Sequence, residues 1–290
     1  MAESAGEVRD GTPQRVMMIG GAMRSGTTVI HRALCTASNS NPYVSESWFL
    51  RDLLAMYSFR LARFDIMGAD QFPSRSDYVA LVADDIERYL RLVSARHSDP
   101  EVLILKHPEL IRYFADLADL SPRMSFLAIV RDPRDVVASM KAVRSRHERD
   151  RSPGPLAGIR SLEGLCGFYA SHYAPLLASA ERLEGRLQIV RYEDAMRRPE
   201  EVIARIGAFC GARYDLAAAP EFQEAHASSP TFDREQRMQD PFARAFWSDL
   251  YTRKLSDERI GTFARSLSPA EIAEIESRLA FIGTRFGYWG

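Results

Sequence analysis

The chain has 290 residues, of which 46% are hydrophobic and 27% are charged, so it can bury a large core and is neither disordered nor collagen-like. Its 38 Lys and Arg residues nearly balance its 39 Asp and Glu residues, and the net charge of −1 excludes a general attraction to nucleic acid or anionic membranes. Any anion-binding site must therefore be local.

The cysteines and the apolar segments bear on the compartment. The three cysteines are scattered, without a C-x-x-C motif or a Cys/His cluster, at Cys35, Cys166 and Cys210. This pattern favours reduced thiols over a disulfide framework or a zinc site. No apolar run approaches the roughly 20 residues needed to cross a bilayer. We therefore expect a cytoplasmic protein with no membrane insertion and no nucleic-acid partner.

Short apolar strands alternate with helical patterns along the first half of the chain. A polar tail over residues 1–14 precedes a buried strand at residues 16–19. A helix is then predicted from Gly26 to Ala37, and a second strand at Tyr43 and Val44. Amphipathic helices follow over residues 48–63 and 79–93. The order of strand, helix and strand predicts a βαβ unit.

The second half of the chain continues this alternation. Strands are predicted at residues 102–105, 125–130 and 187–190, and helices at 135–143, 162–183 and from a capping box at Ser268 and Glu271. Polar or glycine-rich clusters follow four of the five strands. Because the carboxyl ends of parallel strands meet at one edge, these clusters should share a crevice. We predict a single doubly wound α/β domain over residues 15–290, with a mostly parallel central sheet flanked by helices.

A phosphate-binding loop is predicted between the first strand and the first helix. Gly21-Ala-Met-Arg-Ser-Gly26-Thr27-Thr28 has the spacing of a Walker A loop, but threonine stands where that loop has lysine. The glycines let backbone N–H groups surround an anion at the positive end of a helix. Arg24 supplies the loop's cation, which favours a phosphate or sulfate ligand different from Mg·ATP. The alternative is a glycine-rich turn with no ligand.

The sequence Arg24-Ser25-Gly26-Thr27-Thr28 after a hydrophobic strand resembles the 5′-phosphosulfate loop of sulfotransferases, which use 3′-phosphoadenosine 5′-phosphosulfate (PAPS). The resemblance implies that these five residues bind the 5′ end of PAPS. It runs along most of the chain, roughly residues 16–288. It implies PAPS as the donor, 3′-phosphoadenosine 5′-phosphate (PAP) as the product, and no required metal.

A second motif of the same family begins with an arginine at a strand end and places a serine eight residues later. Here Arg131-Asp-Pro-Arg-Asp-Val-Val-Ala-Ser139 has this pattern. An arginine at a strand end can contact a phosphate with two N–H groups. The resemblance implies that Arg131 and Ser139 bind the 3′-phosphate. The alternative is that Arg131 pairs with Asp132 or Asp135 as an ordinary ion pair at the start of a helix.

Two weaker matches lie later in the chain. Tyr192, in Arg-Tyr-Glu-Asp at a strand end, resembles a family tyrosine near the donor's adenosine. Arg259 and Gly261 resemble a late R-x-G loop that closes over the 3′-phosphate. Arg253 and Lys254 are further candidates for the cation of that closure. Without the resemblance, these residues would be an amphipathic tyrosine and a solvated charge cluster.

Three residues are candidates for catalysis. Lys106 resembles the lysine of the family's K-x-P turn and would stabilise charge on the leaving group, although it could also be a solvated strand-end lysine. Glu46, in Glu-Ser-Trp-Phe, resembles the glutamate base of the heparan-type glycan branch, and it is our preferred base. His107 is the rival, by analogy with the K-x-H histidine of the cytosolic small-molecule branch. Glu46 could instead only cap the helix that begins near Trp48.

The predicted function is sulfuryl transfer from PAPS to a hydroxyl group, or less readily an amine, of a small-molecule or glycan acceptor. Acceptor specificity is expected in the variable segments 48–75, 146–165 and 228–250. One rival is a P-loop kinase or NTPase, and another is a nucleotide-binding protein without turnover. No metal site is predicted, because the other histidines lack ligand partners at metal-binding spacing, namely His31, His97, His147, His172 and His226.

Overall fold

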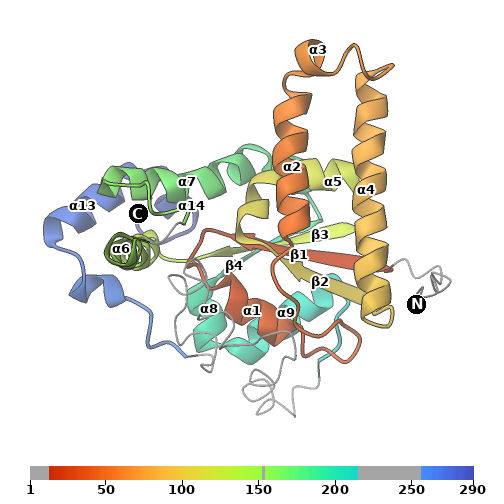
Figure 1. The fold of residues 1–290 in the computed structure, drawn as a ribbon. Coiled ribbons are helices and arrows are strands. Elements are labelled where there is room, and N and C mark those ends of the chain that lie inside the picture. The colour runs from red at the N-terminus through yellow and green to blue at the C-terminus, as the bar shows by residue number, and fades with distance from the viewer. Residues whose placement is uncertain (1–12, 152–153, 215–255) are drawn as a thin grey trace.

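The computed structural model describes residues 13–151, 154–214 and 256–290 (Figure 1). In this part of the chain the central sheet has four strands: β1 (Arg15–Gly21), β2 (Val102–Lys106), β3 (Met124–Val130) and β4 (Leu187–Arg191). They are all parallel and lie in the order β2-β1-β3-β4. Because β1 has β2 on one side and β3 on the other, the direction of winding reverses at β1. Doubly wound sheets bind their ligands at such a point.

Helices cover both faces of the sheet (Figure 1). The side chains of β1 accordingly alternate between two hydrophobic cores. Met17 and Ile19 point into a core formed with α1 (Thr27–Leu34), α8 (Tyr192–Arg197) and α9 (Pro199–Cys210). Val16 and Met18 point into a larger core on the other face. The helices of that face are α2 (Trp48–Leu61), α4 (Arg75–Arg96), α5 (Phe114–Leu120), α6 (Pro133–Asp150), α7 (Leu162–Ala178), α13 (Pro269–Arg278) and α14 (Ala280–Arg285). The predicted doubly wound α/β class is confirmed.

The predicted strand at Tyr43 and Val44 is wrong, and the sheet edge shows why. The segment before α2 does run along the outer edge of β2, but it pairs mainly through a side chain. The Asn41 amide accepts from Ile104 N–H at 2.6 Å and donates to Ile104 C=O at 3.0 Å. On either side, Val102 N–H donates to Asn39 C=O at 3.2 Å and Ser47 N–H donates to Lys106 C=O at 2.9 Å. Side-chain and single backbone bonds thus take the place of a fifth strand.

The helix ends follow the predicted caps. Asp132 accepts from Arg134 N–H at 2.9 Å at the start of α6. Ser268 and Glu271 form the expected capping box of α13. The predicted helix over 162–183 is divided into α7 and a 3-10 helix, η2 (Ala180–Leu183), and Pro108 begins another, η1 (Pro108–Tyr113).

The remaining elements are α3 (Phe64–Met67), at the tip of the hairpin of α2 and α4 in Figure 1, and η5 (Thr262–Arg265). Within the described residues, no helix combines the length and apolarity needed to span a membrane. Residues 1–12 of the predicted tail and the predicted acceptor segment 228–250 lie outside the described residues, as do Arg253 and Lys254.

Candidate active site

The predicted phosphate loop leaves the end of β1 and enters α1 in a conformation that requires glycine. Gly26 has φ 95°, and a Cβ atom there would lie 2.4 Å from the Tyr192 ring. A Cβ atom on Gly21 would lie 2.5 Å from the Ile129 carbonyl oxygen. The loop therefore packs too closely against β3 and Tyr192 to accept any side chain at either glycine.

A tyrosine that the sequence analysis missed attaches this loop to the sheet. The Tyr173 hydroxyl of α7 accepts from Ala22 N–H at 3.0 Å and donates to the Ile129 carbonyl at 2.8 Å. Burial raises the pKa of Tyr173, so the hydroxyl keeps its proton and both bonds. No local pattern around Tyr173 marks this contact, because its partners are about 150 and 44 residues away in sequence.

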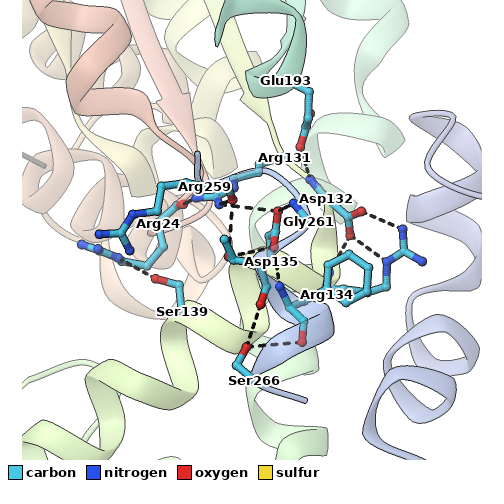
Figure 2. A network of polar contacts seen from close by, with 12 residues as sticks. Arg24, Arg131, Asp132, Arg134, Asp135, Ser139, Glu193, Arg259, Gly261 and Ser266 are labelled. Atoms are coloured by element: carbon cyan, nitrogen blue, oxygen red, sulfur yellow. Dashed lines mark hydrogen bonds and ion pairs between the residues drawn. The ribbon is translucent and has the colours of Figure 1, made fainter. Parts of the chain in front are cut away.

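The residues predicted to bind the 3′-phosphate lie together beside the loop (Figure 2). Arg24 Nε donates to Ser139 Oγ at 3.1 Å, and Arg131 Nη1 donates to the Arg24 carbonyl at 3.3 Å. The Arg131 guanidinium lies 4.5 Å from the centre of the Tyr192 ring, which is itself buried. Arg24 thus joins the first motif to the second.

Arg131 also makes an ion pair at the start of α6, which is its alternative role. Its Nη2 lies 3.5 Å from Asp135 Oδ2 and donates to the Arg259 carbonyl at 2.5 Å. Its Nε is buried and has no hydrogen-bond partner among the described residues. Since buried donors are normally paired, this N–H fits an anionic ligand that is held beside the ion pair.

The late loop, residues 259–263, is fastened to α6 by Asp135, which the sequence analysis named only as an ion-pair partner. Asp135 accepts from Gly261 N–H at 2.8 Å, from Phe263 N–H at 2.9 Å and from Thr262 Oγ1 at 3.2 Å (Figure 2). Gly261 has φ 72°, a conformation that glycine adopts without strain. Arg259 is exposed, and its backbone carbonyl accepts a hydrogen bond from Arg131.

Glu46, Lys106 and His107 meet at the other side of the phosphate loop. Lys106 Nζ is fully buried and donates to Glu46 Oε1 at 2.6 Å and to Thr28 Oγ1 at 3.1 Å. At the start of α2 the N-cap residue is Ser47, which makes no side-chain cap bond, while the Glu46 carboxylate bonds Lys106. His107 Nε2 lies 3.9 Å from Glu46 Oε2, since the chain turns at Pro108. The edge pairing of Ser47 with Lys106 holds Glu46 beside the lysine.

The hydrogen bonds of His107 define which of its ring nitrogens carries the proton. His107 Nδ1 accepts from Glu109 N–H at 3.2 Å, so in the neutral ring the proton is on Nε2. Burial lowers the pKa of His107 to about 4, an effect that Lys106 adds to and Glu46 partly offsets. At neutral pH the nitrogen nearest Glu46 is therefore a donor rather than a proton acceptor.

Of the other described histidines, His31 and His172 belong to the packing of the domain. His31 is buried against Tyr43 and its Nε2 lies 3.2 Å from the Ile104 carbonyl oxygen, while His172 Nδ1 lies 2.8 Å from the Phe168 carbonyl. Burial lowers the pKa of each to about 3. Among the described residues, no group of three or more His, Cys, Asp and Glu side chains could hold a metal ion.

Residues 17–215 match the model of the sulfotransferase family, which covers more than half of the chain and all of the site except the late loop. The chain belongs to the sulfotransferase family. A search of curated proteins gives no match. The family assignment therefore rests on the family model, and the solved structures bear on the fold.

Solved structures show that the fold of this sulfotransferase is shared. It is similar to the sulfotransferase domain from the curacin biosynthetic pathway, with 17% identity, a TM-score of 0.54, and coverage of 93% of this chain and 98% of that one. The sulfotransferase domain of the Synechococcus PCC 7002 olefin synthase has 18% identity and a TM-score of 0.52, with coverage of 93% of this chain and 96% of that one. The sulfotransferase STF9 from Mycobacterium avium has 16% identity and a TM-score of 0.53, with coverage of 94% of this chain and 77% of that one. At these identities the likeness concerns the fold alone.

Proposed function

We propose that this sulfotransferase transfers the sulfuryl group of PAPS to a hydroxyl group, or less readily an amine, of a small-molecule or glycan acceptor. The observation that carries the proposal is the arrangement of two polar clusters around one phosphate loop. Arg24, Arg131 and Ser139 lie together at one of them. Lys106 bonds both Thr28 of the loop and Glu46 at the other.

The two clusters match the two charged ends of the proposed donor. The buried Arg131 Nε and the Ser139 hydroxyl supply donors for a 3′-phosphate, while Tyr192 packs against both Gly26 and Arg131. Backbone N–H groups of the phosphate loop, with the Thr27 and Thr28 hydroxyls, supply donors for the 5′ end. A donor with two separated anions would use both clusters at once.

Transfer requires a base on the acceptor side and a cation on the donor side. Glu46 accepts the proton of the acceptor hydroxyl as its oxygen forms the new S–O bond. The bond between sulfur and the 5′-phosphate oxygen breaks, and Lys106 stabilises the charge that develops there. Since His107 presents an N–H group toward Glu46, the tautomer favours Glu46 as the base.

Binding of the product tests this proposal. PAP should raise the melting temperature of the protein more than AMP or ATP at equal concentration, because only PAP places phosphates at both clusters. A ligand at 100 times its Kd stabilises the folded state by about 2.7 kcal/mol. Differential scanning fluorimetry measures the shifts. Equal shifts with AMP and PAP would contradict the assignment of the 3′-phosphate.

Chelation separates the proposal from the kinase rival. Turnover with PAPS should survive excess EDTA, because Arg24, Arg131 and Lys106 already place positive charge around the proposed donor site. Labelled PAPS and a pool of metabolites or glycans provide the assay. Loss of turnover on chelation, restored by Mg²⁺, would favour a kinase. Binding of PAP without any labelled product would favour the non-catalytic rival.

A further inference from the structure

The carboxylate of Asp135 is the least expected group at the proposed 3′-phosphate position. It is fully buried and lies 3.5 Å from the arginine that would bind this phosphate. A carboxylate beside a phosphate is unfavourable on charge grounds, since two like charges disfavour each other's ionised form. A buried carboxylate with one long ion pair would also be poorly compensated.

The compensation comes from the late loop. Two backbone N–H groups and one hydroxyl of residues 261–263 donate to the two Asp135 oxygens, at 2.8 to 3.2 Å. A second hydrogen bond joins the start of α6 to the late loop, because Arg131 Nη2 donates to the Arg259 carbonyl. Asp135 therefore holds the loop directly, and it holds Arg131 in the position from which Arg131 reaches the loop.

A stacking contact between Arg134 and Phe263 also holds the late loop against α6. The Arg134 guanidinium lies 4.3 Å from the centre of the Phe263 ring and is itself fixed by Asp132 Oδ2 at 2.7 Å and Glu276 Oε1 at 2.7 Å. The first turn of α6 thus contacts the late loop through Asp135 and through Arg134. Of these two, the Asp135 contacts bind the loop backbone beside Gly261.

We propose that Asp135 is a positioning residue that holds the late loop and Arg131 in the arrangement that binds the 3′-phosphate. This inference rests on the proposed function. For the affinity toward the 3′-phosphate, it predicts a change opposite in sign to the one expected from charge alone. Removing the Asp135 charge should strengthen phosphate binding if charge decides, and should weaken it if loop positioning decides.

Asp135→Asn tests the sign. Asparagine keeps the shape but offers one oxygen to three donors and turns an NH₂ group toward the loop amides. We expect the affinity for PAP to fall roughly tenfold, which corresponds to about 1.4 kcal/mol, and the affinity for AMP to stay the same. With PAPS, KM should rise while kcat at saturation changes little. Calorimetric titration and steady-state kinetics measure these effects.

Amide hydrogen exchange supplies a readout without any ligand. Gly261 N–H and Phe263 N–H bond different oxygens of Asp135, and asparagine keeps only one oxygen. At least one of these N–H groups therefore loses its acceptor in Asp135→Asn, and its exchange should accelerate by about tenfold or more while β1 and β3 stay protected. Asp132→Asn is the matched control. It removes the same charge one turn earlier, asparagine still caps α6, and Asp132 bonds to Arg134 rather than to the loop backbone. Because Asp132 acts on the late loop through the Arg134 side chain, exchange at Gly261 and affinity for PAP should change much less in this control than in Asp135→Asn.

The outcomes distinguish this inference from the proposed function. Unchanged exchange at Gly261 and Phe263 would overturn the positioning role, and so would faster exchange with equal or tighter PAP binding. If the wild type does not prefer PAP to AMP, the proposed function fails, while the exchange data still decide whether Asp135 holds the loop. Should Asp135→Asn fold poorly, Thr262→Val removes one of the three donors to Asp135 and should change exchange and affinity in the same direction by a smaller factor.

Discussion

Replacing Glu46 by glutamine is expected to lower kcat by roughly 10²–10⁴, because the variant loses the proposed proton acceptor. Glutamine preserves the size of the side chain and leaves an oxygen that can still accept from Lys106 Nζ, which lies 2.6 Å from Glu46 Oε1. Binding of PAP should therefore change little, while the melting temperature should fall because the buried Lys106 loses its charged partner. Single-turnover measurements with labelled PAPS, together with calorimetric titration of PAP, separate the chemical step from binding.

His107→Asn is the control for the choice of base. Asparagine can replace Nδ1 as acceptor for Glu109 N–H and so preserve the start of η1, but it does not reach Glu46 as the histidine ring does. We expect a much smaller loss of kcat than in Glu46→Gln. If Glu46→Gln retains near-normal turnover and His107→Asn abolishes it, the roles are reversed and His107 is the base.

Arg131→Ala is expected to remove the preference for PAP over AMP. A charged hydrogen bond to the 3′-phosphate contributes about 1.5–3 kcal/mol, which corresponds to a loss of PAP affinity of roughly 10- to 150-fold. AMP lacks this phosphate, so its affinity is the internal control. Calorimetric titration of both nucleotides measures the ratio. An unchanged ratio would assign Arg131 to its ion pair with Asp135 alone.

The architecture could be predicted from the sequence because its signals are local. The four strands found were visible as short apolar runs, and the caps at Asp132 and Ser268 followed from residue type and spacing. The position of Arg131 beside the phosphate loop, which contains Arg24, followed from one further rule, that parallel strands end at the same edge. Ser139 was assigned from the family resemblance and lies beside Arg24.

The features that the sequence did not reveal depend on partners distant in the chain. Tyr173 and Asp135 act through bonds to residues 44 to 151 positions away, for which neither periodicity nor capping patterns exist. The false strand at Tyr43 had a different cause. An extended segment beside a sheet looks like a strand in sequence, whether its backbone or a side chain such as Asn41 makes the bonds.

The bonds of Asn41 have a consequence for contacts between molecules. An open sheet edge offers free N–H and C=O groups on which a strand of another chain can add, and this is a common start of aggregation. Along β2 those groups are already engaged, at Val102, Ile104 and Lys106. A strand from a second molecule would have to displace Asn39, Asn41 and Ser47 together. The segment that holds Glu46 in place therefore also closes this edge to intermolecular pairing.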